Sequence, residues 1–255
     1  MLNEIIEVVK YCGKVLLNAN AEIISTKNND HRNIVTDCDV QIQDILHEKL
    51  LAILPEASFL GEEGLQSFDK NGYCFVCDPI DGTTNFVKNL KHSAISVALL
   101  KAGKPIIGVI YNPYLDELFY AEKGKGAFCN GKQIHTTSES LKKSLIVFGT
   151  SPYDTDLQKQ TWLLAEQSLK VCSDVRRLGS AVLDFADLAC GRFGVFWELK
   201  LRPWDFSAGV LIVEESGGTV RTLDNKPLSN FFEASSIVAL ANADCEKFFD
   251  CIKSI

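Results

Sequence analysis

Two carboxylates and a glycine-hydroxyl turn stand together in the segment Asp78-Pro79-Ile80-Asp81-Gly82-Thr83-Thr84-Asn85-Phe86. The carboxylates are three residues apart with a rigid proline between them, and they follow an apolar run, residues 73–77, that predicts a short buried strand. Gly82 and the two threonines are typical of a tight turn into a helix N-terminus. Carboxylates suit hard cations such as Mg²⁺, and free N–H groups at a helix start suit phosphate. The segment therefore offers both halves of a metal-assisted phosphate site, although capped, solvated turns share this composition.

Other acidic residues also stand at the ends of predicted strands or the starts of predicted helices. They are Asp39, Glu62, Glu63 and Asp205. Bringing such carboxylates together without a partner is costly, because like charges repel and desolvation disfavours the ionised form. Divalent cations would hold them together, and a water molecule bound to such a cation is a better nucleophile. We therefore expect a metal-dependent phosphohydrolase if the carboxylates converge in the fold.

Each of these positions also has a simpler interpretation. Asp39 follows Thr36 and Asp37 at the start of an apolar helical pattern, so any of the three would serve as a helix cap. Glu62 and Glu63 lie between two glycines after a short predicted strand, which is equally typical of a solvated turn.

The periodicity of the chain predicts a mixed α/β or α+β fold in two halves, 1–140 and 141–255, that share one core. In the first half we expect helices over 2–18 and about 40–54, strands over 57–60 and 73–77, an antiparallel meander over 93–129, and a polar loop or hairpin over 25–33. In the second half we expect strands over 145–149, 193–198, 219–223 and 236–240, and helices over 156–169, 182–190, 206–215 and 243–252.

Composition excludes several classes of function. The net charge of −7 argues against nucleic acid or an anionic membrane as the main partner, and no apolar run reaches the roughly 18 residues of a membrane span. The acidic N-terminal residues do not have the pattern of a secretory signal, and nine scattered cysteines indicate reduced thiols, so we expect a cytoplasmic protein. Cys74 and Cys77 match C-x-x-C, but within a strand they face opposite sides, which disfavours a zinc or redox site.

Three segments together resemble the signature sequences of the inositol monophosphatase family, which are Mg²⁺-dependent, lithium-sensitive phosphatases. They are Gly61-Glu62-Glu63, residues 78–86, and Trp204-Asp205-Phe206-Ser207-Ala208-Gly209. The segment from Asn33 to Asp39 matches as well, so the resemblance covers essentially the whole chain. It implies a layered α-β-α-β-α sandwich of the sugar-phosphatase type, and a homodimer.

The resemblance also implies a role for individual residues. Glu62, Asp78 and the Ile80 carbonyl would bind the first metal ion; Asp78, Asp81 and Asp205 would bind the second; and Glu62 would serve a weaker third. Thr83, with Asp39 behind it, would orient the attacking water, while Gly82 and Thr83 N–H groups would bind phosphate. Ala181 and Glu198, together with Asp81 and Asp205, match positions that contact the substrate. Lys27 stands near a lysine of the family, but the loop is one residue longer, so the predicted site omits it.

The predicted reaction is hydrolysis of a small phosphate monoester, with inositol 1-phosphate as the first candidate. Fructose 1,6-bisphosphate, histidinol phosphate and 3′-phosphoadenosine-type nucleotides are alternatives within the same chemistry. Asn85-Phe86 after the threonines fits the inositol branch better than the nucleotidase branch. A non-catalytic regulatory protein that keeps the fold is an alternative of a different class.

Overall fold

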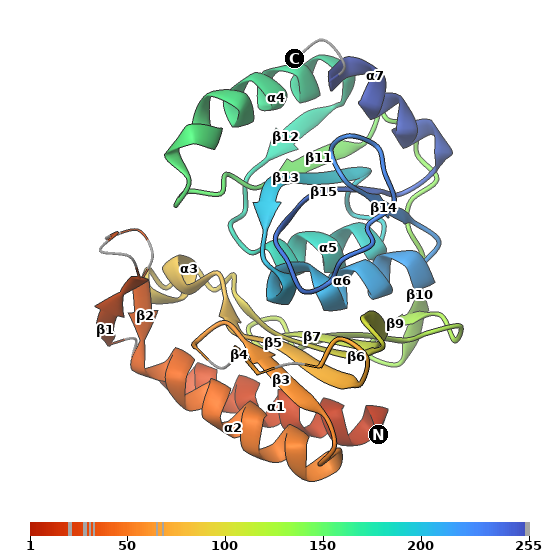
Figure 1. Ribbon diagram of the computed structural model, residues 1–255. Coiled ribbons are helices and arrows are strands. Elements are labelled where there is room, and N and C mark those ends of the chain that lie inside the picture. The colour runs from red at the N-terminus through yellow and green to blue at the C-terminus, as the bar shows by residue number, and fades with distance from the viewer. Residues whose placement is uncertain are drawn as a thin grey trace.

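The protein folds into five alternating layers of helix and sheet (Figure 1). A computed structural model describes residues 1–19, 22–27, 30, 32, 34–64, 66–67 and 69–252. Two helices cover the outer face of a large sheet, two helices fill the space between this sheet and a smaller one, and α4 and α7 lie on the far side of the smaller sheet (Figure 1). The layered sandwich expected from the sequence is therefore confirmed.

The large sheet has eight strands in the order β10-β9-β8-β7-β6-β5-β3-β4. Their bounds are β3 Ser58–Gly61, β4 Gln66–Ser67, β5 Tyr73–Asp81, β6 Ala94–Lys101, β7 Lys104–Asn112, β8 Glu117–Glu122, β9 Ala127–Cys129 and β10 Lys132–Ile134. Strands β5 to β10 pair antiparallel with their neighbours in sequence, as the predicted meander requires, and β3 pairs parallel with β5.

Helices α1 (Leu2–Asn18) and α2 (Asp37–Ile53) cover the outer face of this sheet because each carries an apolar stripe. Ile5, Val9 and Leu16 of α1 are buried with Ile42 and Leu46 of α2 in one hydrophobic cluster under the sheet. A short antiparallel hairpin, β1 (Ile23–Thr26) and β2 (Ile34–Thr36), joins the two helices. It takes the place of the predicted loop or hairpin, of which Asn28, Asn29 and Asn33 lie outside the described residues.

The second half of the chain builds the smaller sheet and the helices on both its faces. The sheet has the order β12-β11-β13-β15-β14, with bounds β11 Leu145–Phe148, β12 Asp174–Arg176, β13 Val195–Leu201, β14 Thr219–Arg221 and β15 Ser235–Leu240. Helices α5 (Ala181–Ala189) and α6 (Pro203–Glu215) lie between the two sheets, while η2 (Thr155–Leu157), α4 (Gln158–Val171), η3 (Ala243–Lys247) and α7 (Phe248–Ile252) occupy the outer layer. One hydrophobic cluster includes Phe119 from the first half and Phe185 from the second. The boundary near residue 140 stays a prediction.

Most predicted elements form, and the differences have local causes. The strand expected to end at Cys77 continues to Asp81, because β6 pairs with it as far as Asp81 opposite Ala94. The register shifts between Asp78 and Asp81, where Pro79 lacks an N–H group to donate. The helix start expected after Gly82 forms as α3 (Thr83–Val87), whereas the short strands β4, β10 and β12 were not predicted, because their few residues carry little periodicity.

The C-x-x-C pair faces opposite sides of the large sheet. Cys74 is buried in the cluster between the sheets and Cys77 in the cluster beneath α1 and α2. All nine cysteines are free thiols. None of the helices in the described ranges is both long and apolar enough to cross a bilayer.

Helix α6 approaches the large sheet so closely that a glycine is required at the contact. A methyl group on Gly108 of β7 would lie 2.8 Å from the Ala208 carbonyl oxygen of α6. On the other side of α6, a methyl group on Gly209 would lie 2.4 Å from the Phe185 ring of α5. These contacts fix the position of α6, the helix that carries Asp205.

We expect Gly108→Ala to lower the free energy of unfolding by about 1–3 kcal/mol, because the helix backbone has to move to make room. Gly72→Ala is the matched control: its nearest neighbour is the Asp69 carboxylate at 3.0 Å, a side chain that can rotate away. Urea denaturation of both variants measures the difference, and equal stability would show that the approach of α6 is not tight.

Candidate metal and phosphate site

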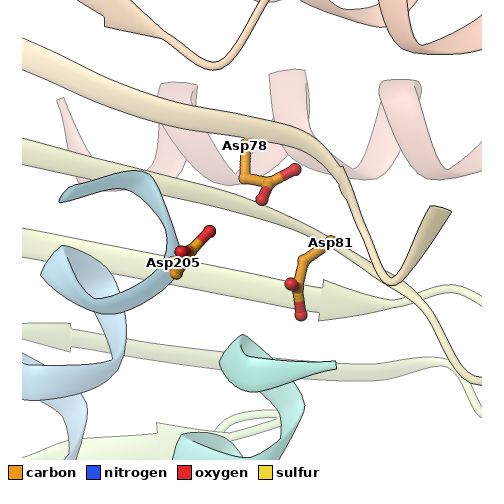
Figure 2. Close-up of side chains that lie close together, drawn as sticks. All are labelled: Asp78, Asp81 and Asp205. Carbon is orange, nitrogen blue, oxygen red and sulfur yellow. The ribbon is translucent and has the colours of Figure 1, made fainter. Parts of the chain in front are cut away.

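Three carboxylates converge between β5 and α6. Ligand oxygens of Asp78, Asp81 and Asp205 all lie within 4.8 Å of one another. Asp78 and Asp81 come from the irregular end of β5 and Asp205 from the first turn of α6, and the three side chains point toward a common space (Figure 2). Asp78 is buried, while the other two are half-buried.

Backbone donors fix the orientation of each carboxylate. The Ile80 N–H donates to Asp78 Oδ1 at 2.9 Å, across the proline turn. The Arg202 N–H donates to Asp205 Oδ2 at 2.6 Å, because Asp205 caps the helix that Pro203 begins. Asp78 and Asp205 are therefore held by the local conformation of their own segments.

Asp81 is held by the other half of the chain. The Val182 N–H donates to Asp81 Oδ2 at 3.0 Å, and the Ser180 hydroxyl donates to the same oxygen. Both donors belong to the start of α5, where N–H groups lack partners within the helix. Ala181, a predicted substrate contact, lies between them as the first residue of α5.

The electrostatics of this cluster are unfavourable without a cation. Burial, followed by the charges of Glu62, Asp81 and Asp205, raises the pKa of Asp78 well above its usual value. Burial also raises the pKa of Asp81 to about 7, although the Ser180 and Val182 donors oppose the change. The pKa of Asp205 is raised well above normal by burial and by the charges of Asp81 and Glu62.

Asp39 serves both of the functions that the sequence left open. Its Oδ2 accepts the Thr36 N–H at 2.8 Å and the Thr36 hydroxyl, forming a capping box at the start of α2. Its Oδ1 lies 3.3 Å from the Thr83 hydroxyl, so the same side chain also reaches the candidate site. Burial raises the pKa of Asp39 to about 6, against the hydrogen bonds from Thr36.

The turn after β5 has the geometry expected of a glycine-hydroxyl turn. Gly82 has φ +85° and precedes α3, and a methyl group on it would lie 3.1 Å from both the Gly179 and the His92 carbonyl oxygens. Only glycine combines this backbone conformation with such close neighbours. The Thr83 hydroxyl lies 3.0 Å from the Ile80 carbonyl oxygen, so it can donate to that oxygen or to Asp39.

Glu62 lies next to the cluster but is paired with a cation. The Lys27 ammonium lies 2.8 Å from a carboxylate oxygen of Glu62 and 2.8 Å from one of Glu63. Burial lowers the pKa of Lys27, but the two glutamates outweigh this effect and raise it. Gln43 of α2 holds the Glu63 backbone through two hydrogen bonds of 2.7 Å. The glutamate pair is therefore a fixed, partly buried feature and not a solvated turn.

Glu198 forms a separate part of the site on β13. It is buried, with 7 % of its surface exposed, and its Oε1 accepts hydrogen bonds from the Ser151 N–H at 2.8 Å and the Ser151 hydroxyl at 3.0 Å. Burial raises its pKa, while the Ser151 donors lower it. Its negative charge contributes to the raised pKa of both Asp81 and Asp205.

Comparison with known proteins relates this arrangement to a family. The sequence profile of the inositol monophosphatase family matches residues 1–249. The chain belongs to the inositol monophosphatase family. It is 35% identical to an inositol-1-monophosphatase of Rhizobium meliloti over 244 residues, covering 93% of this chain and 90% of that protein.

Two further relatives carry another name. The crystal structure of the extragenic suppressor protein suhB from Bartonella henselae superposes with a TM-score of 0.88 at 30% identity, over 98% of this chain and 97% of that one. The Nus factor SuhB of Escherichia coli is 33% identical over 226 residues, covering 86% of this chain and 84% of that protein. Proteins named for phosphatase activity and for another function are thus similarly close to this chain.

The residues of this family member fit a divalent cation. Three carboxylates that burial drives toward protonation offer oxygen ligands in one small space, which is the donor chemistry that Mg²⁺ prefers. The Ile80 carbonyl oxygen lies within reach of the Thr83 hydroxyl beside them. Glu62 is a neighbour of this cluster by its charge, but its carboxylate is not one of the three that meet.

Three residues of the site, Lys27, Asn85 and Ser151, are not among those predicted from the sequence. Lys27 was omitted, although it binds both glutamates. Asn85 lies inside the signature segment, and its amide donates to the His92 and Leu178 carbonyl oxygens at 2.8 and 2.9 Å, which ties α3 to the segment before α5. Ser151 holds Glu198. The position of Asn85 within the signature was a usable signal; no pattern in the sequence pointed to Ser151.

The raised pKa values predict that the metal-free protein becomes less stable as pH rises. Asp39 has a pKa of about 6 and Asp81 of about 7 in the folded state, against about 3.9 in an unfolded chain. Between these limits the folded state binds more protons than the unfolded state, so the free energy of unfolding falls as pH increases from about 4 to 7. Urea denaturation in the presence of EDTA measures this trend.

The variant Asp81→Asn should show a flatter pH dependence, by up to about one proton, because one of the perturbed groups is gone. Asp44→Asn, which changes an exposed carboxylate of α2, should keep the wild-type dependence. A metal-free wild-type protein whose stability increases over the same pH range would contradict the expected repulsion.

Proposed function

We propose that the protein hydrolyses a small phosphate monoester in a Mg²⁺-dependent reaction, with inositol 1-phosphate as the first candidate substrate. The observation that supports this proposal is the convergence of Asp78, Asp81 and Asp205 next to the Gly82–Thr83 turn. The protein has a net charge of −7, and carboxylates gather at the site itself. An anionic substrate would be repelled there unless bound cations offset the negative charge.

In this proposal the residues hold two or three cations and the substrate in fixed positions. Asp78, Asp81, Asp205, Glu62 and the Ile80 carbonyl oxygen would hold the cations. Bound Mg²⁺ would supply positive charge at the phosphate and lower the pKa of water. The N–H groups of Gly82 and Thr83 would bind phosphate oxygens, as the left-handed conformation of Gly82 favours.

Thr83 and Asp39 would orient the attacking water and accept its proton. The Thr83 hydroxyl can accept a hydrogen bond from water while it donates its own proton to Asp39 Oδ1, which lies 3.3 Å away. A pKa of about 6 for Asp39 makes this carboxylate a better proton acceptor than an ordinary aspartate. Glu198 and Ala181 would contact substrate hydroxyl groups on the opposite side, next to α5.

Other functions remain as alternatives. Fructose 1,6-bisphosphate, histidinol phosphate and 3′-phosphoadenosine-type nucleotides would use the same cations and phosphate site. The similarity to proteins named Nus factor SuhB supports a second candidate, a regulatory protein that binds partners through the same fold. The homodimer and the cytoplasmic location stay predictions.

A panel of substrates at fixed Mg²⁺ tests the proposal. We expect phosphate release from inositol 1-phosphate that stops when EDTA is added and returns with Mg²⁺. Asp81→Asn should lower kcat about a thousandfold, because a cation ligand supports several kcal/mol of transition-state stabilisation. The fold should survive, since the substitution also relieves repulsion among the carboxylates.

Circular dichroism of Asp81→Asn is the control for folding, and Asp44→Asn is the control for a lost surface carboxylate. Folded wild-type protein that releases no phosphate from any member of the panel, with or without Mg²⁺, would favour the regulatory alternative.

Lithium inhibition follows from membership of the family and provides a second test. We expect inhibition of the Mg²⁺-dependent activity by Li⁺ in the submillimolar-to-millimolar range, with no effect of equal concentrations of Na⁺ or K⁺. An activity that requires Mg²⁺ but is unaffected by Li⁺ would mean that the cation site differs from the one the family resemblance implies.

A further inference from the structure

The loop between β11 and η2 contacts Glu198 and contains a residue with an uncommon backbone conformation. Its residue Ser151 is 7 % exposed and has φ +40°, a conformation that is uncommon for any residue except glycine. The strained residue is therefore held in place by the contacts around it, and such residues cluster at functional sites.

Most of those contacts lead to one carboxylate. The Ser151 N–H donates to Glu198 Oε1 at 2.8 Å, and its hydroxyl lies 3.0 Å from the same oxygen. The hydroxyl also lies 3.0 Å from the Lys200 carbonyl oxygen, so its single proton is shared between the two acceptors. Within the part of the chain that the structure describes, the N–H group donates to Glu198 alone, so this bond is the more constant one.

The backbone of the same loop confines the other carboxylate oxygen. A methyl group placed on Gly149 would lie 1.8 Å from Glu198 Oε2, so this oxygen packs directly against the Gly149 backbone. The Gly149 N–H is itself bonded to the Trp197 carbonyl oxygen at 3.0 Å. Glu198 is thus held by donors at Oε1, whereas Oε2 rests against Gly149 on one side and accepts no hydrogen bond from the residues that the structure describes.

An ion pair between Lys200 and Asp154 connects the far end of the loop to β13. The Lys200 ammonium lies 2.7 Å from Asp154 Oδ2, and the Asp154 N–H donates to the Ser151 carbonyl oxygen at 3.0 Å. This pair is exposed and contributes little to stability. The backbone hydrogen bonds of Ser151 and Asp154 remain without the Ser151 hydroxyl, so attachment of the loop to β13 alone does not account for that hydroxyl.

We propose that Ser151 is a positioning residue for Glu198: its N–H group, together with a hydroxyl shared with the Lys200 carbonyl oxygen, holds Oε1 and thereby orients Oε2 to accept a hydroxyl group of the substrate. This inference rests on the proposed function, in which Glu198 faces the polyol part of the substrate. The hydrogen bonds of the Ser151 side chain and N–H group go to Glu198 and Lys200 and not to the three converging carboxylates or the Gly82–Thr83 turn. It therefore determines which alcohol the site prefers and not whether phosphate is hydrolysed.

Two substitutions separate this role from a purely structural one. Ser151→Ala removes the hydroxyl and keeps the left-handed conformation with its strain. Ser151→Gly removes the hydroxyl and relieves the strain as well. We expect Ser151→Gly to have a higher Tm than Ser151→Ala, and both variants to share the same loss of substrate preference.

That preference is measured with two substrates. Inositol 1-phosphate offers hydroxyl groups to Glu198, whereas phenyl phosphate offers none. Both Ser151 variants should raise KM for inositol 1-phosphate about tenfold, because the hydroxyl's hydrogen bond to a charged group is lost and the Ser151 N–H group alone then holds Oε1. KM for phenyl phosphate and kcat for both substrates should stay close to wild type.

Ser216→Ala is the matched control. Ser216 is also buried, and its hydroxyl lies 2.8 Å from the Val213 carbonyl oxygen at the C-terminal end of α6, away from Asp205. This variant should keep the wild-type ratio of the two KM values. In the double variant Ser151→Ala with Glu198→Gln, the loss should be close to that of Glu198→Gln alone, since the two residues act as one unit.

The carboxyl chemical shift of Glu198 in ¹³C-labelled protein gives a readout that needs no substrate. Because the Ser151 donors lower the pKa of Glu198, the carboxyl should titrate at higher pH in Ser151→Ala and at the wild-type pH in Ser216→Ala. An unchanged titration, or a KM that rises equally for both substrates, would overturn the role of Ser151. Wild-type protein that hydrolyses neither substrate would instead contradict the proposed function, and the titration would still decide the role of Ser151.

Discussion

Repulsion among carboxylates is the constraint on which the rest of this structure depends. Asp78 is buried beside Asp81, Asp205 and Glu62, and burial raises the pKa of three of these groups. The chain compensates by directing N–H donors at the carboxylates from Ile80, Val182 and Arg202. Two of these donors lie at the starts of α5 and α6, where the helix dipole also favours negative charge. Bound cations would offset the negative charge that remains.

The middle layer of helices therefore positions the donors to Asp81 and Asp205. Helices α5 and α6 begin at the same edge, next to the end of β5, and each supplies a donor to a carboxylate (Figure 1). Their positions are set by close contacts that need small residues, such as Gly108 against Ala208 and Gly209 against Phe185. Packing deep in the core thus determines how far apart the carboxylates lie.

Many of the elements could be predicted from the sequence, because periodicity is clear in α1, α2 and the meander, whereas the layered arrangement was implied by the family resemblance. The signature segments predicted that Asp78, Asp81 and Asp205 meet, and they do. The pairing of Glu62 and Glu63 with Lys27 could not be predicted, because it depends on the path of a polar hairpin with no apolar pattern. The hydrogen bonds from Ser151 to Glu198 depend on a left-handed backbone conformation at Ser151, and the residue types in this loop do not indicate such a conformation.

Alternate side chains of β5 enter two different hydrophobic clusters. Cys74 and Val76 belong to the cluster between the sheets, and Phe75 and Cys77 to the cluster under α1 and α2. β5 is covered by a hydrophobic cluster on each face and by a neighbouring strand on each edge. Water can therefore reach its backbone only if one of these clusters is disrupted. Its amide hydrogens should exchange with solvent only when the molecule opens globally. The strand β1, which precedes Lys27, is exposed along its whole length, so its amide hydrogens should exchange much earlier than those of β5.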